Sequence, residues 1–182
     1  MNPVILVHGG AWDIPDDVVE DHKKGCEFAM KEGYEILKNG GCALDAVEMA
    51  VRLMEDDSTF DAGTGAFLNS DGEVELDAII MDHDFNVGGV AAVRNIKNPV
   101  ILARKVMEET EHILLVGEGA NRFAKKIGIQ ECSPEDLLVG RELERWRRIK
   151  RDKKFRVRKV FSGTVGAVAM DINIFFLSCF SK

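Results

Sequence analysis

One peptide bond near the end of the chain constrains the fold more than any other feature. The Gly163–Thr164 bond joins a basic segment to an apolar run that is typical of a strand and covers residues 165–170. Cleavage of this bond would leave Thr164 with a hydroxyl and a free amine on one residue, the nucleophile-and-base pair that threonine needs to attack a carbonyl. The alternative interpretation is a buried strand preceded by a glycine, which is a common arrangement.

The length and the cysteine pattern indicate one globular domain in a reducing compartment. A chain of 182 residues with 46% hydrophobic content can bury an ordinary core. The four cysteines form no Cys-x-x-Cys pair, and the N-terminus lacks a basic or long apolar leader, so we expect a cytoplasmic chain without disulfides or structural zinc. The longest apolar run, residues 174–180, is shorter than the ~20 residues of a membrane helix, which predicts no membrane span.

Positive charge is concentrated directly before Thr164. Residues 141–182 carry 12 Lys and Arg against 4 Asp and Glu, which leaves 12 against 27 in residues 1–140. A nucleic-acid-binding arm is one interpretation of such a block, but aromatic residues are sparse in it and no nucleic-acid-binding motif accompanies it. We therefore expect residues 140–162 to form a solvated, mobile connection and expect no nucleic-acid partner.

Hydrophobic periodicity and turn residues predict one mixed α/β domain. We expect strands at 4–7, 87–93 and 113–116, a hairpin at 66–80 with an Asp-Gly turn, and helices at 16–38, 43–54, 99–107, 119–127 and 134–148. The first strand meets His8-Gly9-Gly10, where glycine lets the backbone approach another group closely. His8 itself is interpreted as a hydrogen-bonded structural residue, with a catalytic role as the alternative.

The segment at 55–65 is too acidic for a core and too rich in glycine for regular structure. Carboxylate and carbonyl oxygens can converge in such loops and bind hard cations. A plain surface loop is the alternative that the residues alone leave open.

Several stretches, taken together, resemble the plant-type L-asparaginase and isoaspartyl peptidase family of N-terminal-nucleophile hydrolases. The matching stretches lie at residues 7–10, 41–55, 60–65, 72–78, 81–82, 98–99, 106–108 and 163–169. Their order and spacing cover the chain to about Asp171, so no single motif carries the resemblance. It favours the interpretation of Thr164 as a nucleophile over that of a plain strand.

The resemblance implies a four-layer αββα sandwich that is made as a precursor and cuts itself between Gly163 and Thr164. Residues 1–163 would then form an α-subunit-like region, and residues 164–182 the start of a β subunit. Thr164 would attack the side-chain amide of asparagine or the isopeptide carbonyl of β-aspartyl dipeptides, with its own amine as base. The family assembles as an (αβ)₂ dimer of heterodimers and needs no organic cofactor.

The family's cation loop corresponds to the acidic segment. The resemblance implies a structural sodium-like ion held by the backbone carbonyls of Met54, Glu55, Asp57, Phe60, Ala62 and Thr64.

The chain departs from the family at two places. Asp61 stands where relatives usually carry asparagine, and after Asp171 the family pattern stops. We therefore expect a truncated member that lacks the further threonines, the substrate-clamping residues and the oxyanion hole, and that is inactive as given. The alternatives are a non-catalytic α-subunit-like fragment and, within the enzymes, a glycosylasparaginase. The choice between asparagine and β-aspartyl dipeptides is not readable from these residues.

Overall fold

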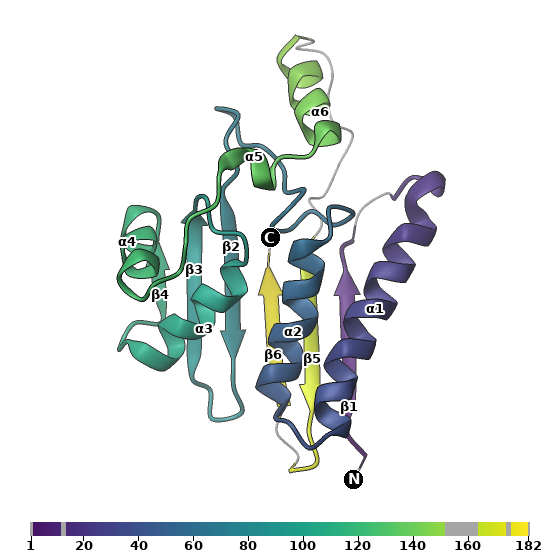
Figure 1. The fold of residues 1–182 in the computed structure, drawn as a ribbon, viewed down its shortest axis with the longest axis vertical. Coiled ribbons are helices and arrows are strands. Elements are labelled where there is room, and N and C mark those ends of the chain that lie inside the picture. Colours follow the sequence, from purple (N-terminus) through teal and green to yellow (C-terminus); the bar gives the residue numbers. More distant parts are fainter. Residues whose placement is uncertain (1, 12–13, 152–163, 174–175, 182) are drawn as a thin grey trace.

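The computed structural model describes residues 2–11, 14–151, 164–173 and 176–181, with side-chain surroundings omitted for 176–180. Six strands form one sheet in the order β1-β5-β6-β2-β3-β4, in which only β3 and β4 are parallel neighbours (Figure 1). The strands are β1 Val4–Gly9, β2 Leu76–Met81, β3 Val87–Val93, β4 Leu114–Val116, β5 Val165–Met170 and β6 Phe176–Ser181. The helices are α1 Val19–Lys38, α2 Ala43–Asp56, α3 Pro99–Glu109, α4 Glu118–Lys126, α5 Pro134–Leu137 and α6 Gly140–Arg151, and a short 3₁₀ turn covers Asp16–Val18.

Strand β5 lies beside β1, although the two are separated by most of the chain (Figure 1). They pair antiparallel from Val4 opposite Met170 to Gly9 opposite Val165, and β6 pairs with the other edge of β5. This register brings the His8-Gly9-Gly10 turn next to Thr164. The two ends of the chain therefore meet where the sequence predicts chemistry.

Helix α2 forms the centre of the core. Ala46, Val47, Ala50, Val51 and Met54 are all fully buried and recur at three- and four-residue spacings on one side of the helix. Burial of a Val or Met side chain stabilises a fold by roughly 1.5–3 kcal/mol, so this stripe holds α2 against the sheet. The helix contacts β1, β5 and β6 on one side and α1 and α3 on the others.

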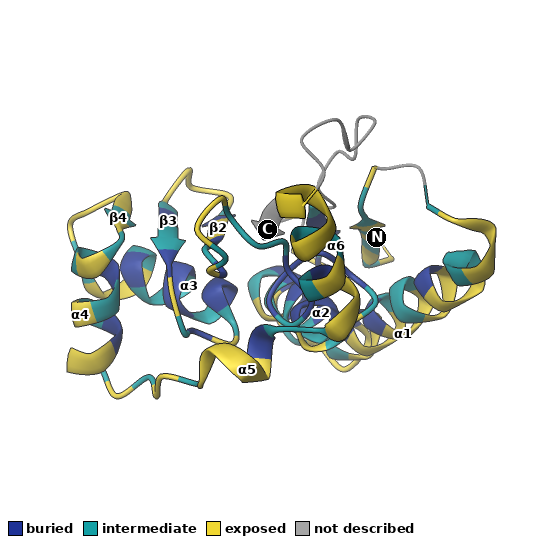
Figure 2. Cartoon of the chain, turned by 90° about the horizontal axis from the view of Figure 1, so that it is seen from above, coloured by how far each residue is buried: buried dark blue, intermediate teal, exposed yellow. Residues whose placement is uncertain are grey.

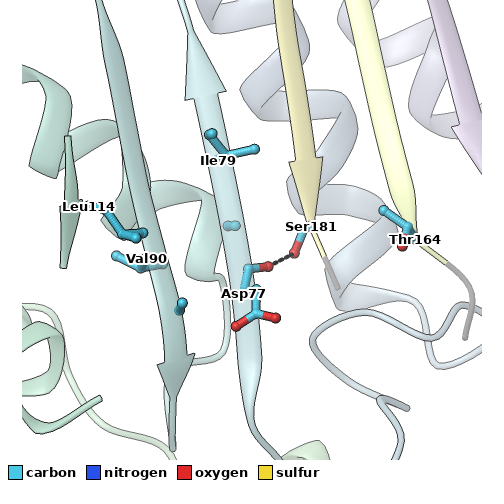
Figure 3. A pocket seen from close by; sticks show the side chains of 8 residues that line it. Asp77, Ile79, Val90, Leu114, Thr164 and Ser181 are labelled. Atoms are coloured by element: carbon cyan, nitrogen blue, oxygen red, sulfur yellow. Dashed lines mark hydrogen bonds between the residues drawn. The ribbon is translucent and has the colours of Figure 1, made fainter. Parts of the chain in front are cut away.

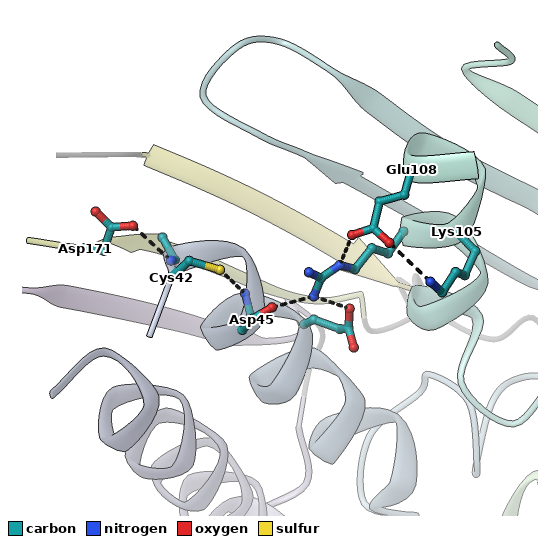
Figure 4. Close-up of polar contacts among 8 residues, drawn as sticks. Cys42, Asp45, Lys105, Glu108 and Asp171 are labelled. Atoms are coloured by element: carbon teal, nitrogen blue, oxygen red, sulfur yellow. Dashed lines mark hydrogen bonds and ion pairs between the residues drawn. The ribbon is translucent and has the colours of Figure 1, made fainter. Parts of the chain in front are cut away.

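The first half of α2 is fixed by polar contacts (Figure 4). At its start, the Ala43 amide donates to the buried Asp171 carboxylate, at 3.2 Å, directly after β5. On its outer side, Arg104 of α3 binds Asp45 at 2.7 Å, Glu48 at 2.9 Å and Glu108 at 2.6 Å. These contacts join α2 to both β5 and α3.

Helices α1, α2 and α3 pack on one side of the sheet (Figure 2), and the opposite face leaves apolar residues of β1, β2 and β5 exposed. Val4, Leu6, Ile79 and Val168 are 53%, 60%, 45% and 41% exposed, and each alternates with less exposed neighbours along its strand. Leu6 and Val168 lie opposite each other in the β1–β5 register. We call these four residues the bare face. The α/β class is confirmed, with one helical layer and one sheet among the described residues.

Most predicted elements are present with shifts of one or two residues, and two differ. The predicted hairpin is reduced to one bridge, between Leu68 and Val74, because β2 pairs with β3 and β6 instead. The predicted helix at 134–148 is broken into α5 and α6.

Part of the predicted mobile connection is helical. Gly140–Arg151 form α6, which lies over the 67–72 segment: the Trp146 indole donates to the Asn69 carbonyl at 3.1 Å, and the Arg145 guanidinium lies 4.4 Å from the Phe67 ring centre. Residues 152–162 lie outside the described residues.

The structure bears on two further expectations. Cys26, Cys42 and Cys132 are free thiols in the part of the chain that the structure describes. No helix in the described ranges has the length and apolarity needed to cross a membrane.

Candidate active site

Thr164 lies directly before β5, at the end of a strand flanked by β1 and β6. It is half-buried, whereas Val165 behind it is fully buried and anchors the strand. Gly163, the other half of the predicted cleavage site, lies outside the described residues. The fold therefore holds Thr164 at the boundary between a rigid strand and the chain that precedes it.

An open cavity of about 360 Å³ is lined by Thr164 together with residues of β2, β3, β4 and β6 (Figure 3). Its wall is mostly apolar and includes Ile79 and Leu114. The polar groups come from Thr164, Ser181 and Asp77: the Ser181 hydroxyl donates to the Asp77 carbonyl at 3.4 Å, and the Asp77 carboxylate accepts from the Ala92 amide at 2.8 Å. A small polar substrate group could thus be held beside Thr164 by a few fixed partners.

His8 contacts the predicted nucleophile. Its Nδ1 lies 2.9 Å from the Thr164 carbonyl oxygen and 3.3 Å from the Gly10 amide nitrogen. The interpretation of His8 as a hydrogen-bonded residue is confirmed, but its partner could not be read from the sequence because the two residues are 156 positions apart.

Phe60 connects the acidic loop to the same corner of the sheet. Its buried ring packs edge-on against the His22 ring, with ring centres 5.5 Å apart. A methyl group at Gly9 would lie 2.8 Å from the Phe60 ring, and one at Gly25 would lie 2.7 Å from it. Glycine is needed at both positions because the ring occupies the space of a side chain. The loop therefore supports the turn that carries His8 and Gly10.

The acidic loop presents backbone oxygens, as a carbonyl-lined cation site requires. A methyl group built on Gly65, whose φ is +99°, would lie 2.8 Å from both the Ser58 and the Phe60 carbonyl oxygens. These two oxygens thus converge on one small space that only glycine leaves open. Among the described residues, no three His, Cys, Asp or Glu side chains gather as metal ligands.

The structure shows where some of the predicted carbonyl ligands lie. The Phe60 carbonyl belongs to the convergent pair. The other oxygen, the Ser58 carbonyl, is a ligand that the sequence analysis did not include, and it accepts from the Arg141 guanidinium at 3.1 Å. The Glu55 carbonyl already accepts from the Thr64 amide at 2.8 Å, and the Asp57 carbonyl accepts from the Phe60 amide at 3.1 Å. A second lone pair on each oxygen remains for a cation.

Glu55 has a role in the core that the sequence analysis missed. Its side chain is fully buried, and burial raises its pKa to about 8, although the nearby polar groups of Ser181, Val100 and Asn98 lower the pKa. The carboxyl group is therefore largely protonated at neutral pH. The signal for this role is a lone glutamate on the apolar stripe of α2, one position after Met54.

Asp61, a position at which the resemblance leads us to expect asparagine, stabilises the loop. Its Oδ1 accepts from the Phe67 amide at 2.7 Å, and the residue is 9% exposed. An asparagine oxygen could accept the same bond, so this contact by itself does not require a carboxylate.

Comparison with known proteins identifies the family of this chain. The family model described as asparaginase matches residues 1–176, and the chain belongs to this family. It is 47% identical over 173 residues to the isoaspartyl peptidase/L-asparaginase of Xenopus laevis, covering 94% of this chain and 56% of that protein. The human protein of the same name is also 47% identical, over 94% of this chain and 57% of its own length.

A more distant relative gives the same result. The plant-type L-asparaginase of Pyrococcus furiosus is 41% identical, over 92% of this chain and 59% of its own length. The chain thus spans little more than half the length of the curated relatives that it matches.

Proposed function

We propose that this chain carries the nucleophile of an L-asparaginase or isoaspartyl peptidase. The substrates would be the side-chain amide of asparagine and the isopeptide bond of β-aspartyl dipeptides. The observation that carries the proposal is the position of Thr164, which is half-buried before the interior strand β5, lies on the wall of a cavity and is bonded to His8. The names of the relatives support the substrate class.

The first chemical step is cleavage of the chain itself. The Thr164 Oγ attacks the Gly163 carbonyl carbon, the peptide C–N bond breaks, and the nitrogen takes a proton to become the Thr164 amine. Water then hydrolyses the resulting ester and frees the hydroxyl. The strand behind Thr164 is rigid, so the hydroxyl stays near its position while the preceding chain leaves.

The same atoms then act on substrate. The Thr164 amine accepts the hydroxyl proton as Oγ attacks the substrate carbonyl, ammonia or an α-amine leaves with a proton, and water hydrolyses the acyl-enzyme. The oxyanion needs preorganised donors, and loss of one such donor costs about 10²–10³ in rate in a well-studied hydrolase. In relatives, more than two fifths of the protein lies beyond the part that this chain matches, and we propose that some of these donors come from there.

Two further features belong to this proposal. The 54–64 segment would hold a monovalent cation such as sodium through carbonyl oxygens, with Ser58 added to the predicted ligands, and the ion would stiffen the loop behind Phe60. The complete enzyme would form the (αβ)₂ assembly implied by the family. Neither feature adds a group to the reaction.

The test is a chimera in which residues 1–170 are followed by the corresponding C-terminal part of the Xenopus relative. We expect it to release ammonia from asparagine and aspartate from β-aspartyl dipeptides. Thr164→Ala should abolish both activities, whereas Thr164→Ser, which keeps a hydroxyl, should retain part of them. An active Thr164→Ala chimera would contradict the proposed nucleophile.

A further inference from the structure

The His8 imidazole lies at the end of the β1–β5 pairing, where the next pair of backbone hydrogen bonds would form. The last ladder pair is Gly9 opposite Val165, so Gly10 and Thr164 face each other beyond it. The imidazole Nδ1 contacts both of these residues, at 3.3 Å from the Gly10 nitrogen and 2.9 Å from the Thr164 oxygen. It therefore stands between an amide and a carbonyl that would otherwise face each other directly.

Nδ1 can serve only one of these partners at a time. A carbonyl oxygen only accepts hydrogen bonds and a backbone N–H only donates, while a ring nitrogen carries either a proton or a lone pair. With a proton on Nδ1, His8 donates to Thr164; with a lone pair there, it accepts from Gly10. The shorter contact is the one to Thr164, which favours the protonated Nδ1.

We propose that His8 is a positioning residue for Thr164 and acts through the proton on Nδ1. The inference rests on the proposed role of Thr164 as nucleophile. A hydrogen bond to the Thr164 carbonyl fixes the backbone of the residue whose hydroxyl and amine react. When Nδ1 lacks a proton, the same nitrogen anchors the Gly10 turn instead and releases Thr164.

The surroundings of His8 suit this role. Gly10 has a φ of +109°, which glycine adopts without strain, so its amide can turn toward the ring. Gly9 is held by the Phe60 ring, so the turn has a fixed support. His8 itself is exposed on the side of the sheet that bears the bare face, beside a small cavity that it lines with Leu6 and Val168.

The first test reads the proton directly and needs no activity. Long-range ¹H–¹⁵N NMR on the labelled 182-residue chain distinguishes protonated from unprotonated ring nitrogens in its four histidines. The His8 signals are those lost in His8→Asn. We expect a protonated Nδ1 at neutral pH. An unprotonated Nδ1 with the proton on Nε2 would overturn the proposal, whether or not Thr164 is the nucleophile.

The second test uses two substitutions of equal size. His8→Asn offers an N–H donor near the Nδ1 position, whereas His8→Asp offers only acceptors there. In the chimera, we expect His8→Asp to lower kcat by about 10–100-fold, since misplacement by 1 Å can cost about 10². His8→Asn should recover most of this loss, with KM for asparagine little changed in both.

Melting temperatures of the two variants check that both fold. Equal kcat for His8→Asn and His8→Asp would overturn the proposal, because a purely structural role would not distinguish donor from acceptor. An active Thr164→Ala chimera would instead remove the proposed function and leave the NMR result standing. The two failures are therefore distinguishable.

Discussion

The Val100 amide donates to the Glu55 carboxyl group at 3.1 Å in a fully buried setting, so the last turn of α2 caps the first turn of α3. A carboxyl group at a helix N-terminus satisfies an amide that the helix leaves unpaired. Because Glu55 is removed from water, it fills this role mostly in its neutral form at physiological pH. The core thus contains an acid whose ionisation opposes folding.

This arrangement predicts a pH dependence of stability. The pKa of Glu55 is about 8 in the folded protein against an ordinary value of 4.5. The folded state therefore holds an extra proton between these values, and the stabilisation is full below pH 4.5 and lost as the pH rises toward 8. The slope is up to about 1.4 kcal/mol per pH unit.

Glu55→Gln removes the titration while keeping the size and an acceptor for Val100. We measure the free energy of unfolding of both proteins in urea from pH 5 to 9. The value for Glu55→Gln minus that for the wild type should increase as the pH rises. Other carboxyl groups affect both proteins alike, so the difference isolates Glu55. Parallel curves for the two proteins would show that Glu55 is ionised in the fold.

The carbonyl oxygens that converge on Gly65 predict a response to sodium. Sodium that binds only the folded state should raise the melting temperature, compared with a bulky organic cation at the same ionic strength. Gly65→Ala would place a methyl group 2.8 Å from the Ser58 and Phe60 oxygens and should abolish the response.

Gly40→Ala is the matched control for that experiment. Gly40 also has a positive φ, +83°, but a methyl group there meets no atom within 4 Å. The variant should lose stability from backbone strain and keep the sodium response. A response that persists in Gly65→Ala, or that is missing from the wild type, counts against the site.

Arg104 predicts a large effect from one partly buried charge (Figure 4). Its side chain is 21% exposed and binds Asp45, Glu48 and Glu108. Arg104→Met leaves three carboxylates close together without their cation and should lower the free energy of unfolding by about 1–3 kcal/mol.

Arg94→Met serves as the comparison for Arg104. Arg94 pairs with Glu73 and Glu75 but is 47% exposed, so its loss should lower the free energy of unfolding by much less than the loss of Arg104. Similar losses for both variants in chemical denaturation would show that burial of the Arg104 cluster adds little.

The sequence predicted those parts of the fold that depend on local patterns. The stripe on α2 follows from three- and four-residue spacings, and the strand at Val87–Val93 follows from a short apolar run, both of which are properties of neighbouring residues. The hairpin at 66–80 was largely wrong because the sheet offered β2 longer partners, β3 and β6. The partner of a strand depends on the whole sheet, so a turn sequence such as Asp-Gly predicts it poorly.

For the site, too, local features could be predicted from the sequence and long-range contacts could not. Thr164 was predicted from the bond before it and from the resemblance, and the structure brings it to a cavity wall beside a strand end. The His8–Thr164 contact and the Glu55 cap could not be predicted, because each joins residues far apart in the chain through a register that only folding creates. The position of α6 after the break from α5 also depends on a distant contact, because the Trp146 indole donates to the Asn69 carbonyl.

The bare face predicts self-association of a polypeptide limited to residues 1–182. Leu6 and Val168 lie side by side on it and are 60% and 41% exposed. Contiguous apolar patches of this kind promote association. Size-exclusion chromatography at high micromolar concentration should show oligomers, and the double variant Leu6→Lys with Val168→Lys should shift them toward monomer. A sharp monomer peak for the unmodified polypeptide would contradict this expectation.

The central claim is that Thr164 becomes the N-terminal residue of a cut chain and acts as its nucleophile. Intact-mass spectrometry of the chimera tests it most directly. The account predicts two polypeptides, the second beginning at Thr164, and a single uncut polypeptide for Thr164→Ala. The polypeptide limited to residues 1–182 should remain uncut if oxyanion donors lie beyond it. Asparagine hydrolysis by an uncut chimera, or a cut at any other bond, would contradict the account.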